Sequence, residues 1–324
     1  MQSATIRSFT RSVCWILMSG TLALTLGGCS HPPKRVSEPD IMATAEGVRY
    51  EMRYFYGQDG VRLFRQAWIP DSKAKGVLVV VHGLKDHSGR YADLGQTLAK
   101  QGFAVFAADL RGHGHSGGTP QMADNFNDYL VDLALMVRQA RTQFPDTPVF
   151  LLGQDMGGLI ATRFVEMIPN AVQGLAVSSA TLALQESKYK LWGLKVVAAI
   201  APSAALKQID VKAYSHDPDV AQELANDPLV SQSGIPAKTL QQEVNAIQTL
   251  NEQTERLTLP ILVMHGVADT INPLFGSIAF YDAVPSEQKT LKQYPDLAHD
   301  LWHETGNEAV IADLTEWLNG LVKH

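Results

Sequence analysis

The sequence contains only two cysteines in 324 residues, Cys14 and Cys29. Cys14 lies inside an N-terminal segment with the features of a signal peptide, and Cys29 stands at its end. A mature domain without a free thiol has no disulfide, no thiolate-bound metal and no cysteine nucleophile. The low cysteine content therefore excludes disulfide scaffolds, thiolate metal centres and thiol catalysis.

Stretches rich in lysine and arginine are also absent. The formal net charge is −6 at pH 7 and the pI is about 5.9. No basic stretch is interleaved with aromatic residues, so nucleic acid is not expected as a partner. The sequence shows neither an internal repeat nor a low-complexity segment. With 45% hydrophobic residues, the chain is long enough for one large α/β domain or two small ones.

Residues 1–28 are predicted to be a lipoprotein signal peptide. A basic start with Arg7 and Arg11 precedes an apolar core, residues 13–26, which is too short for a comfortable membrane span. The core ends in Leu26-Gly27-Gly28-Cys29, which resembles the bacterial lipoprotein box, where the cysteine is lipidated and becomes the first residue. An ordinary signal peptide or an uncleaved anchor remains the alternative.

The resemblance to lipoproteins also implies a location. Ser30, rather than aspartate, follows the cysteine, which implies an outer-membrane anchor facing the periplasm. Residues 29–47 contain three prolines and charges of both signs. We interpret this segment as a tether that holds the following domain, residues 48–321, away from the membrane.

Hydrophobic patterns in this domain predict strands that alternate with helices. Apolar runs predict buried strands at 76–81, 104–108, 149–152, 172–178, 259–266 and 289–294. An earlier pair of strands, 49–56 and 61–68, is expected to form a hairpin around Gly57–Gly60. Helices are expected at 92–101, 127–142, 159–168, 274–283 and 307–321. This alternation predicts a doubly wound, mostly parallel sheet with right-handed crossovers.

The alternation stops between residues 179 and 258, where helical stretches and prolines occur without a clear strand. We expect a helical cap, inserted after the sixth strand, over the carboxyl ends of the strands, where open α/β sheets bind ligands. A second independent domain is disfavoured because the same sheet must be re-entered afterwards. The apolar residues of the cap would either line an acyl channel or pack on the core: Leu182, Leu184, Leu191, Trp192, Leu194, Val196, Val197 and Ile200.

A strand, a tight turn and a helix meet at Gly153-Gln154-Asp155-Met156-Gly157. One polar residue with small residues two positions to either side is the pattern of a nucleophile elbow. The glycines are needed because the turn brings backbone close to backbone. Most such elbows have serine at the centre, whereas this sequence has Asp155.

Four motifs stand in order along the chain. They are His82-Gly83-Leu84 with the following residues 86–91, Asp109-x-Arg111-Gly112-His113-Gly114-x-Ser116-x-Gly118, the elbow, and His265-Gly266-x-x-Asp269-x-Ile271-x-Pro273. On these motifs the chain resembles α/β-hydrolases of the monoacylglycerol lipase and lysophospholipase type, with a serine aminopeptidase S33-type hydrolase domain. The resemblance extends over about residues 48–321.

The resemblance implies the roles of the site residues. Asp269 would be the acid of a triad and His299 its base, in the family's order of nucleophile, acid and histidine. The backbone N–H groups of Leu84 and Met156 would form the oxyanion hole. No cofactor is implied. His303 could pair with His299 on one helical face, but the glutamate of a metalloprotease helix is missing, and no metal site is predicted.

Asp155 changes the expected chemistry. If a carboxylate attacks an ester, the tetrahedral intermediate expels the carboxylate rather than the alkoxide, because their conjugate acids differ by roughly ten pKa units. In haloalkane dehalogenases and epoxide hydrolases, which share this fold, an aspartate instead attacks saturated carbon and a histidine then activates water. Dehalogenases usually have tryptophan where this chain has Met156, and epoxide opening requires a cap tyrosine, for which Tyr189 and Tyr214 are candidates.

Three hypotheses follow. The protein is a hydrolase of lipid-derived esters such as monoacylglycerols or lysophospholipids, with weak, water-mediated turnover because of Asp155. Alternatively, it is a hydrolase of epoxides or alkyl halides that uses Asp155 as nucleophile, or a protein that binds acyl ligands without catalysis. A lipid-anchored enzyme would encounter lipid-derived molecules, which favours the first hypothesis.

Overall fold

The computed structural model describes residues 40–184 and 186–322. All of them belong to the unit Val36–His324, within which the chain is densely packed. The predicted signal peptide, Cys29 and the first part of the predicted tether lie outside the described residues, so the structure leaves these predictions open.

Nine strands of the described ranges form one sheet, in the order β1-β2-β3-β5-β4-β6-β7-β10-β11. Six neighbouring strands of this sheet run parallel: β5, β4, β6, β7, β10 and β11. At the other edge, β1, β2 and β3 pair antiparallel. The prediction of a mostly parallel sheet is confirmed. The strands are β1 (Asp40–Ala45), β2 (Val48–Tyr56), β3 (Arg62–Pro70), β4 (Gly76–Val81), β5 (Phe103–Ala108), β6 (Val149–Gln154), β7 (Gly174–Ser178), β10 (Ile261–Gly266) and β11 (Lys289–Tyr294).

Strand β1 lies in the segment predicted as a tether, and for Asp40–Ala45 that prediction is wrong. Ala45 pairs with Val48 across a two-residue turn in which Glu46 and Gly47 have φ of 51° and 80°. Positive φ at both central residues is the type I′ geometry that matches the twist of a hairpin. Because β1 precedes the predicted strands, the cap insertion follows the seventh strand rather than the sixth.

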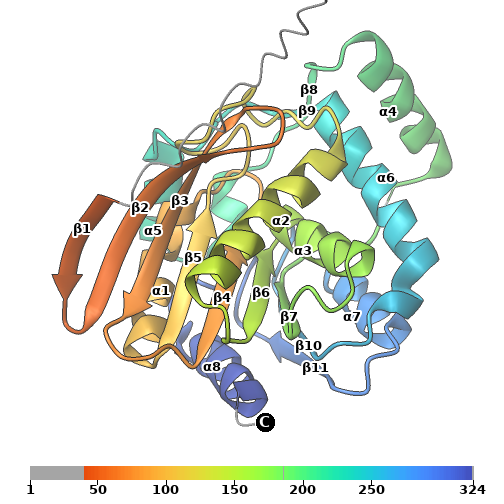
Figure 1. Cartoon of the computed structure of the whole chain (residues 1–324). Coiled ribbons are helices and arrows are strands. Elements are labelled where there is room, and N and C mark those ends of the chain that lie inside the picture. The colour runs from red at the N-terminus through yellow and green to blue at the C-terminus, as the bar shows by residue number, and fades with distance from the viewer. Residues whose placement is uncertain (1–39, 185, 323–324) are drawn as a thin grey trace, which may run out of the picture. The chain divides into compact units, whose positions relative to one another are not determined.

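Helices cover both faces of the sheet, as a doubly wound fold requires (Figure 1). Alternate residues of β4 pack on opposite faces: Leu78 and Val80 lie in one core with α1 and α8, and Val77 and Val79 lie in the other with α2 and α3. All four side chains are buried. The helices are α1 (Ala92–Lys100), α2 (Phe126–Gln143), α3 (Met156–Met167), α7 (Leu274–Ala283) and α8 (Glu308–Val322).

The inserted cap contains helices α4 (Lys188–Ile200), α5 (Pro218–Asn226) and α6 (Ala237–Gln253). It also contains a small antiparallel pair, β8 (Ala205–Lys207) and β9 (Ile235–Pro236), which the sequence did not suggest because strands of two and three residues have no readable period. Helix α6 packs against α2 and α3 of the main domain. Within the described part of the chain, no helix has the length and hydrophobicity needed to cross a membrane.

Candidate active site

The turn between β6 and α3 has the backbone geometry of an elbow. Asp155 stands at its tip with φ 51° and ψ −122°, a conformation that is strained for a residue with a side chain. A Cβ on Gly153 would lie 2.4 Å from the carbonyl oxygen of Gly157, and a Cβ on Gly157 would lie 2.1 Å from that of Val81. The two glycines are therefore required by close backbone packing, as predicted.

The carboxylate of Asp155 is buried and accepts three hydrogen bonds from described residues. Its Oδ2 accepts from the backbone N–H of Leu84 at 2.9 Å. Its Oδ1 accepts from Asn272 Nδ2 at 2.6 Å and from Thr181 Oγ1 at 2.8 Å. An ionised carboxylate only accepts hydrogen bonds, and all three of these partners donate. The surroundings of position 155 are therefore complementary to a negative charge.

Asp269 and His299 come together beside Asp155, as the family resemblance implied. His299 Nδ1 lies 2.9 Å from Asp269 Oδ2, so this nitrogen carries a proton and donates it to the carboxylate. Asp269 Oδ1 accepts from the backbone N–H groups of Ile271 and Asn272 at 2.8 and 3.0 Å. His299 Nε2 is buried without a hydrogen-bond partner among the described residues and lies 4.0 Å from Asp155 Oδ1.

The charges around His299 set its protonation. Burial lowers the pKa of His299, but the neighbouring carboxylates, first Asp269 and then Asp155, outweigh this effect and raise the pKa above its ordinary value of 6.5. The imidazolium form is thus stabilised between two carboxylates. Because only neutral imidazole accepts a proton, any role of His299 as a base requires a pH above this raised pKa.

The two predicted oxyanion-hole donors lie on either side of the elbow. Leu84 follows Gly83, whose hypothetical Cβ would lie 2.6 Å from the Cβ of Asp155. Only glycine therefore allows the chain to pass so close to the elbow. Met156 is the first residue of α3, where backbone N–H groups point out of the helix and favour negative charge. Leu84 N–H already binds the carboxylate of Asp155, while the role of Met156 stays a prediction.

Three residues of this site were not identified from the sequence. Thr181 and Asn272 hold Asp155, and Gln154 binds the carbonyl oxygen of His299 at 3.0 Å through its Nε2. Gln154 also accepts from Trp302 Nε1 at 3.2 Å. Asn272 occupies an unspecified position inside the motif of Asp269, and Gln154 directly precedes the elbow. The sequence could have indicated Asn272 and Gln154 only through their closeness to these motifs.

The two candidate tyrosines of the cap lie in different environments. Tyr189 is 77% exposed on α4, whereas Tyr214 is 3% exposed. The ring of Tyr214 stands edge-on to that of His299, with the centroids 5.0 Å apart, and its hydroxyl donates to the carbonyl oxygen of Leu84 at 3.0 Å. Burial and then the charge of Asp155 raise the pKa of Tyr214 well above 10, so the phenol is protonated.

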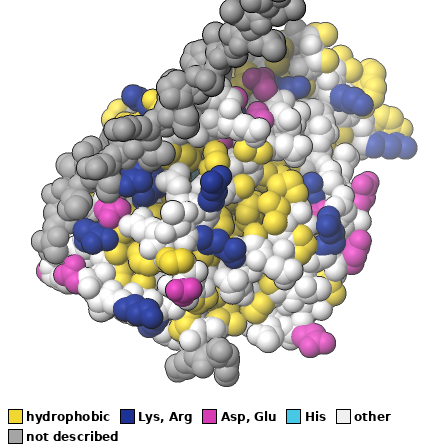
Figure 2. All heavy atoms as spheres, in the orientation of Figure 1, with side chains coloured by type: hydrophobic (Ala, Val, Ile, Leu, Met, Phe, Trp, Pro, Cys, Tyr) yellow, Lys and Arg dark blue, Asp and Glu magenta, His cyan; other side chains and the backbone are white. Residues whose placement is uncertain are grey.

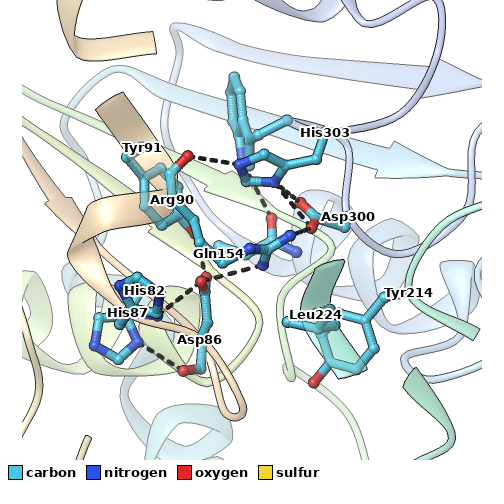
Figure 3. A network of polar contacts seen from close by, with 12 residues as sticks. His82, Asp86, His87, Arg90, Tyr91, Gln154, Tyr214, Leu224, Asp300 and His303 are labelled. Atoms are coloured by element: carbon cyan, nitrogen blue, oxygen red, sulfur yellow. Dashed lines mark hydrogen bonds and ion pairs between the residues drawn. The ribbon is translucent and has the colours of Figure 1, made fainter. Parts of the chain in front are cut away.

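Asp300, which follows His299 in the sequence, belongs to a network of charged side chains (Figure 3). Arg90 bridges two carboxylates, Asp86 at 3.2 Å and Asp300 at 2.6 Å. His303 lies between acceptors, with Nδ1 2.8 Å from Asp300 and Nε2 2.6 Å from the carbonyl oxygen of Arg90. Burial lowers the pKa of His303, but Asp300 outweighs it and raises the pKa overall. The position of His303 is thus explained by ion pairing, and the described residues contain no group of three or more metal-ligating side chains.

Comparison with known proteins gives consistent matches. The sequence model of the family described as "Serine aminopeptidase, S33" matches residues 72–306. A monoacylglycerol lipase of Mycolicibacterium smegmatis is 32% identical over 82% of this chain and 95% of its own length, and a monoglyceride lipase of Rattus norvegicus is 31% identical over 85% and 93%. The crystal structure of a Paleococcus ferrophilus monoacylglycerol lipase superposes with a TM-score of 0.72 at 28% identity, over 81% of this chain and 99% of that one. These matches confirm the α/β-hydrolase fold, and the homologues are carboxylic ester hydrolases.

Proposed function

Because the chain belongs to the serine aminopeptidase S33 family of α/β-hydrolases, we propose that it hydrolyses lipid-derived carboxylic esters of the monoacylglycerol type. One observation carries the proposal. His299 is bound to Asp269 through Nδ1, and its unpartnered Nε2 faces the elbow position among the described residues. This is the arrangement of a base that removes a proton during acyl transfer. The substrate class is supported by two relatives named as monoacylglycerol or monoglyceride lipases, each covered over more than nine tenths of its length.

Asp155 limits how this arrangement operates. Attack by its carboxylate on an ester carbonyl returns to the starting ester, since the carboxylate is the better leaving group. Hydrolysis therefore proceeds by water, which attacks the carbonyl carbon while Nε2 of His299 takes its proton and later gives it to the departing alkoxide. Asp155 also occupies the N–H of Leu84. Losing one oxyanion donor costs about 10²–10³ in rate, so turnover is expected to be slow.

We expect the native protein to release fatty acid from a monoacylglycerol slowly, with a rate that rises with pH. The pKa of His299 is raised above 6.5, so the base is neutral, and active, only as the pH rises through that higher value. Fatty-acid release is measured from pH 5 to 9 for the native protein and for His299→Gln. The variant should lose the pH-dependent turnover. Equal rates in both proteins would show that His299 is not the base.

One observation favours a second candidate function. Asp155 Oδ2 already lies on the N–H of Leu84, and Oδ1 faces His299. If Oδ1 attacks the saturated carbon of an epoxide or alkyl halide, an alkyl–aspartyl ester forms as the carbon–oxygen or carbon–halogen bond breaks. Water activated by His299 then attacks Cγ of Asp155 while Leu84 N–H stabilises the oxyanion on Oδ2. The geometry thus suits the hydrolysis of such an intermediate.

The second candidate predicts an isotope pattern. After one turnover of an epoxide in ¹⁸O-labelled water, one labelled oxygen should be found in the peptide that contains Asp155, because water attacks its carbonyl carbon and the original Oδ1 leaves with the product. Peptide mass spectrometry measures the label, with His299→Gln as control. Label in the diol alone would contradict an aspartyl ester. A protein that binds fatty acid but turns over neither class would be an acyl-binding protein.

The proposed location is the outer membrane, facing the periplasm, through a lipid on Cys29. A surface feature of the cap supports contact with lipid. Within α4, three large apolar residues are strongly exposed: Tyr189 77%, Trp192 70% and Ile200 78%. Exposed lysines 188, 190 and 195 lie on the same helix, and Figure 2 shows hydrophobic and basic side chains together over α4. Trp192 and Ile200 therefore neither pack on the core nor line an enclosed channel, and a mixed apolar and basic helix face suits a membrane interface.

We expect Cys29→Ala to remain unlipidated and to lose its stable attachment to membranes, because a lipidated cysteine supplies most of the anchoring free energy. Fractionation of cell envelopes and N-terminal mass spectrometry of the mature chain measure this effect. Ser30→Asp serves as a matched variant that keeps the lipid and tests sorting between the two membranes. A mature chain that starts at another residue would contradict the proposal.

A further inference from the structure

In the loop that follows β4, residues 84, 85 and 87 are each linked to the cap. The carbonyl oxygen of Leu84 accepts from Tyr214 Oη at 3.0 Å. Lys85 Nζ donates to the carbonyl oxygens of residues 231 and 233, at 2.8 and 2.6 Å. His87 Nε2 lies 2.8 Å from Asp227 Oδ2. The segment 84–87, which presents the N–H of Leu84 to the elbow, therefore contacts the cap at three of its four residues.

Lys85 is the unusual member of this loop. Its φ is 52°, a left-handed conformation that is uncommon for a residue with a long side chain. The side chain is 1% exposed, and none of the described carboxylates forms an ion pair with its ammonium group. Burial accordingly lowers the pKa of Lys85. Both the strained backbone of Lys85 and its buried ammonium group cost free energy. We interpret this cost as a sign that the contacts of Lys85 with the cap have a function.

The cap turn that binds Lys85, residues 231–233, is also bound by a second loop of the core. Gln121, which also has a positive φ of 54°, donates through Nε2 to Ser231 Oγ at 2.6 Å. The carbonyl oxygen of Gln121 accepts from Thr239 Oγ1 at 2.7 Å at the start of α6. Two residues in left-handed conformations, one from each of two core loops, thus bind the same part of the cap. This turn has a defined position relative to the core.

The peptide group that carries Leu84 N–H is held from two sides. On the core side, His82 Nδ1 lies 2.7 Å from the carbonyl oxygen of Gly83. Gly83 itself has no side chain and gives the backbone little rigidity. On the other side, the restraints are Tyr214 on the carbonyl of Leu84 and the side chain of Lys85, and both belong to contacts with the cap. In the native protein Leu84 N–H also donates to Asp155 Oδ2, so the direction of this N–H depends most on a docked cap where that carboxylate is absent, as in Asp155→Ser.

We propose that Lys85 is a positioning residue that couples the cap to the oxyanion hole, so that Leu84 N–H is correctly placed only while the turn 231–233 binds Lys85. The catalytic part of this inference rests on the proposed ester hydrolysis, whereas the structural part does not. Displacement of the cap by an entering lipid would loosen the oxyanion donor, and return of the cap would restore it. The cap thus controls the chemistry as well as access.

The structural part is tested by amide hydrogen exchange in the native protein, where Asp155 also holds the Leu84 amide, and in Asp155→Ser, where it does not. Lys85→Met removes the link to the cap. Lys85→Gly also removes it, and because glycine adopts positive φ without strain, this variant should fold even if Lys85→Met does not. Both variants should raise exchange of the Leu84 amide and of residues 231–235 at least tenfold, with β4 unchanged. Lys73→Met, an exposed lysine on the loop before β4, is the matched control. Unchanged exchange at Leu84 in the Asp155→Ser background, or a uniform increase over the whole domain, would overturn the proposal.

The catalytic part is tested in the Asp155→Ser background. Adding Lys85→Gly should lower kcat for a monoacylglycerol about 10²-fold and leave KM nearly unchanged, because an oxyanion donor acts in the transition state. A rise in KM with an unchanged kcat would overturn the positioning role. If Asp155→Ser alone hydrolyses no ester, the proposed function fails, and the hydrogen-exchange result still decides whether Lys85 positions Leu84.

Discussion

Asp155→Ser is expected to convert a protein that hydrolyses esters slowly into an efficient ester hydrolase. A serine at the elbow would place its Oγ near His299 Nε2, which lies 4.0 Å from the present carboxylate. It would also free the N–H of Leu84 for the oxyanion of the substrate. In serine hydrolases, a nucleophile and base acting as a unit contribute on the order of a millionfold. We expect a gain approaching that size, measured as fatty-acid release from a monoacylglycerol under identical conditions.

The matched control for this gain is Asp155→Asn. Asparagine removes the negative charge and keeps the size of the side chain, but it supplies no hydroxyl nucleophile, so it should gain little. Labelling by a fluorophosphonate checks the serine directly, since the reagent reacts only with an activated hydroxyl. A folded Asp155→Ser protein that neither hydrolyses esters nor reacts with the reagent would refute the assignment of the elbow. If the native protein acts on epoxides, the serine variant should lose that activity.

In the same background, Asp269→Asn is expected to remove about 10⁴ of the gained kcat. The reason lies in the hydrogen bonds of Asp269. Its Oδ1 accepts from the backbone N–H groups of Ile271 and Asn272, so the amide oxygen of asparagine must take that place. The amide NH₂ then faces Nδ1 of His299, which has to become an acceptor. The proton moves to Nε2, and the base that serine needs is lost.

Asp296→Asn provides the control for Asp269→Asn, because Asp296 is exposed on the loop that leads to His299. It should leave kcat unchanged. The tautomer itself can be observed by nitrogen NMR of His299, as a proton on Nε2 in the asparagine variant and on Nδ1 in its parent. An Asp269→Asn variant with full activity would show that another group orients His299.

Much of the fold could be predicted because local patterns determine it. The runs of Val77–Val81 and Val149–Leu152 alternate with amphipathic helices, and short-range periodicity is legible in one sequence. The glycines of the elbow were also predictable, since backbone contact forbids a Cβ there. Strand β1 was missed because its turn, Glu46-Gly47, lacks the asparagine or aspartate of a typical hairpin signal.

The site was predictable only in part, for a physical reason. Asp269 and His299 stand in motifs that end strands, and the carboxyl ends of parallel strands meet at one edge of the sheet. The partners of Asp155 are different. Thr181 lies at the entrance to the cap, and Asn272 reaches the elbow across 117 residues of sequence. Such contacts follow from how loops pack in space, which no local pattern encodes. The lipobox stays a prediction because Cys29 lies outside the described residues.

The three donors around Asp155 have a consequence for product release. Leu84 N–H, Asn272 and Thr181 together form a receptor for a carboxylate. Once serine replaces Asp155, the fatty acid formed by hydrolysis presents the same group to the same donors. The engineered enzyme should then be subject to product inhibition, with a rapid first turnover and slow later ones. In the native protein the side chain of Asp155 fills that receptor and would compete with the carboxylate of any acyl ligand.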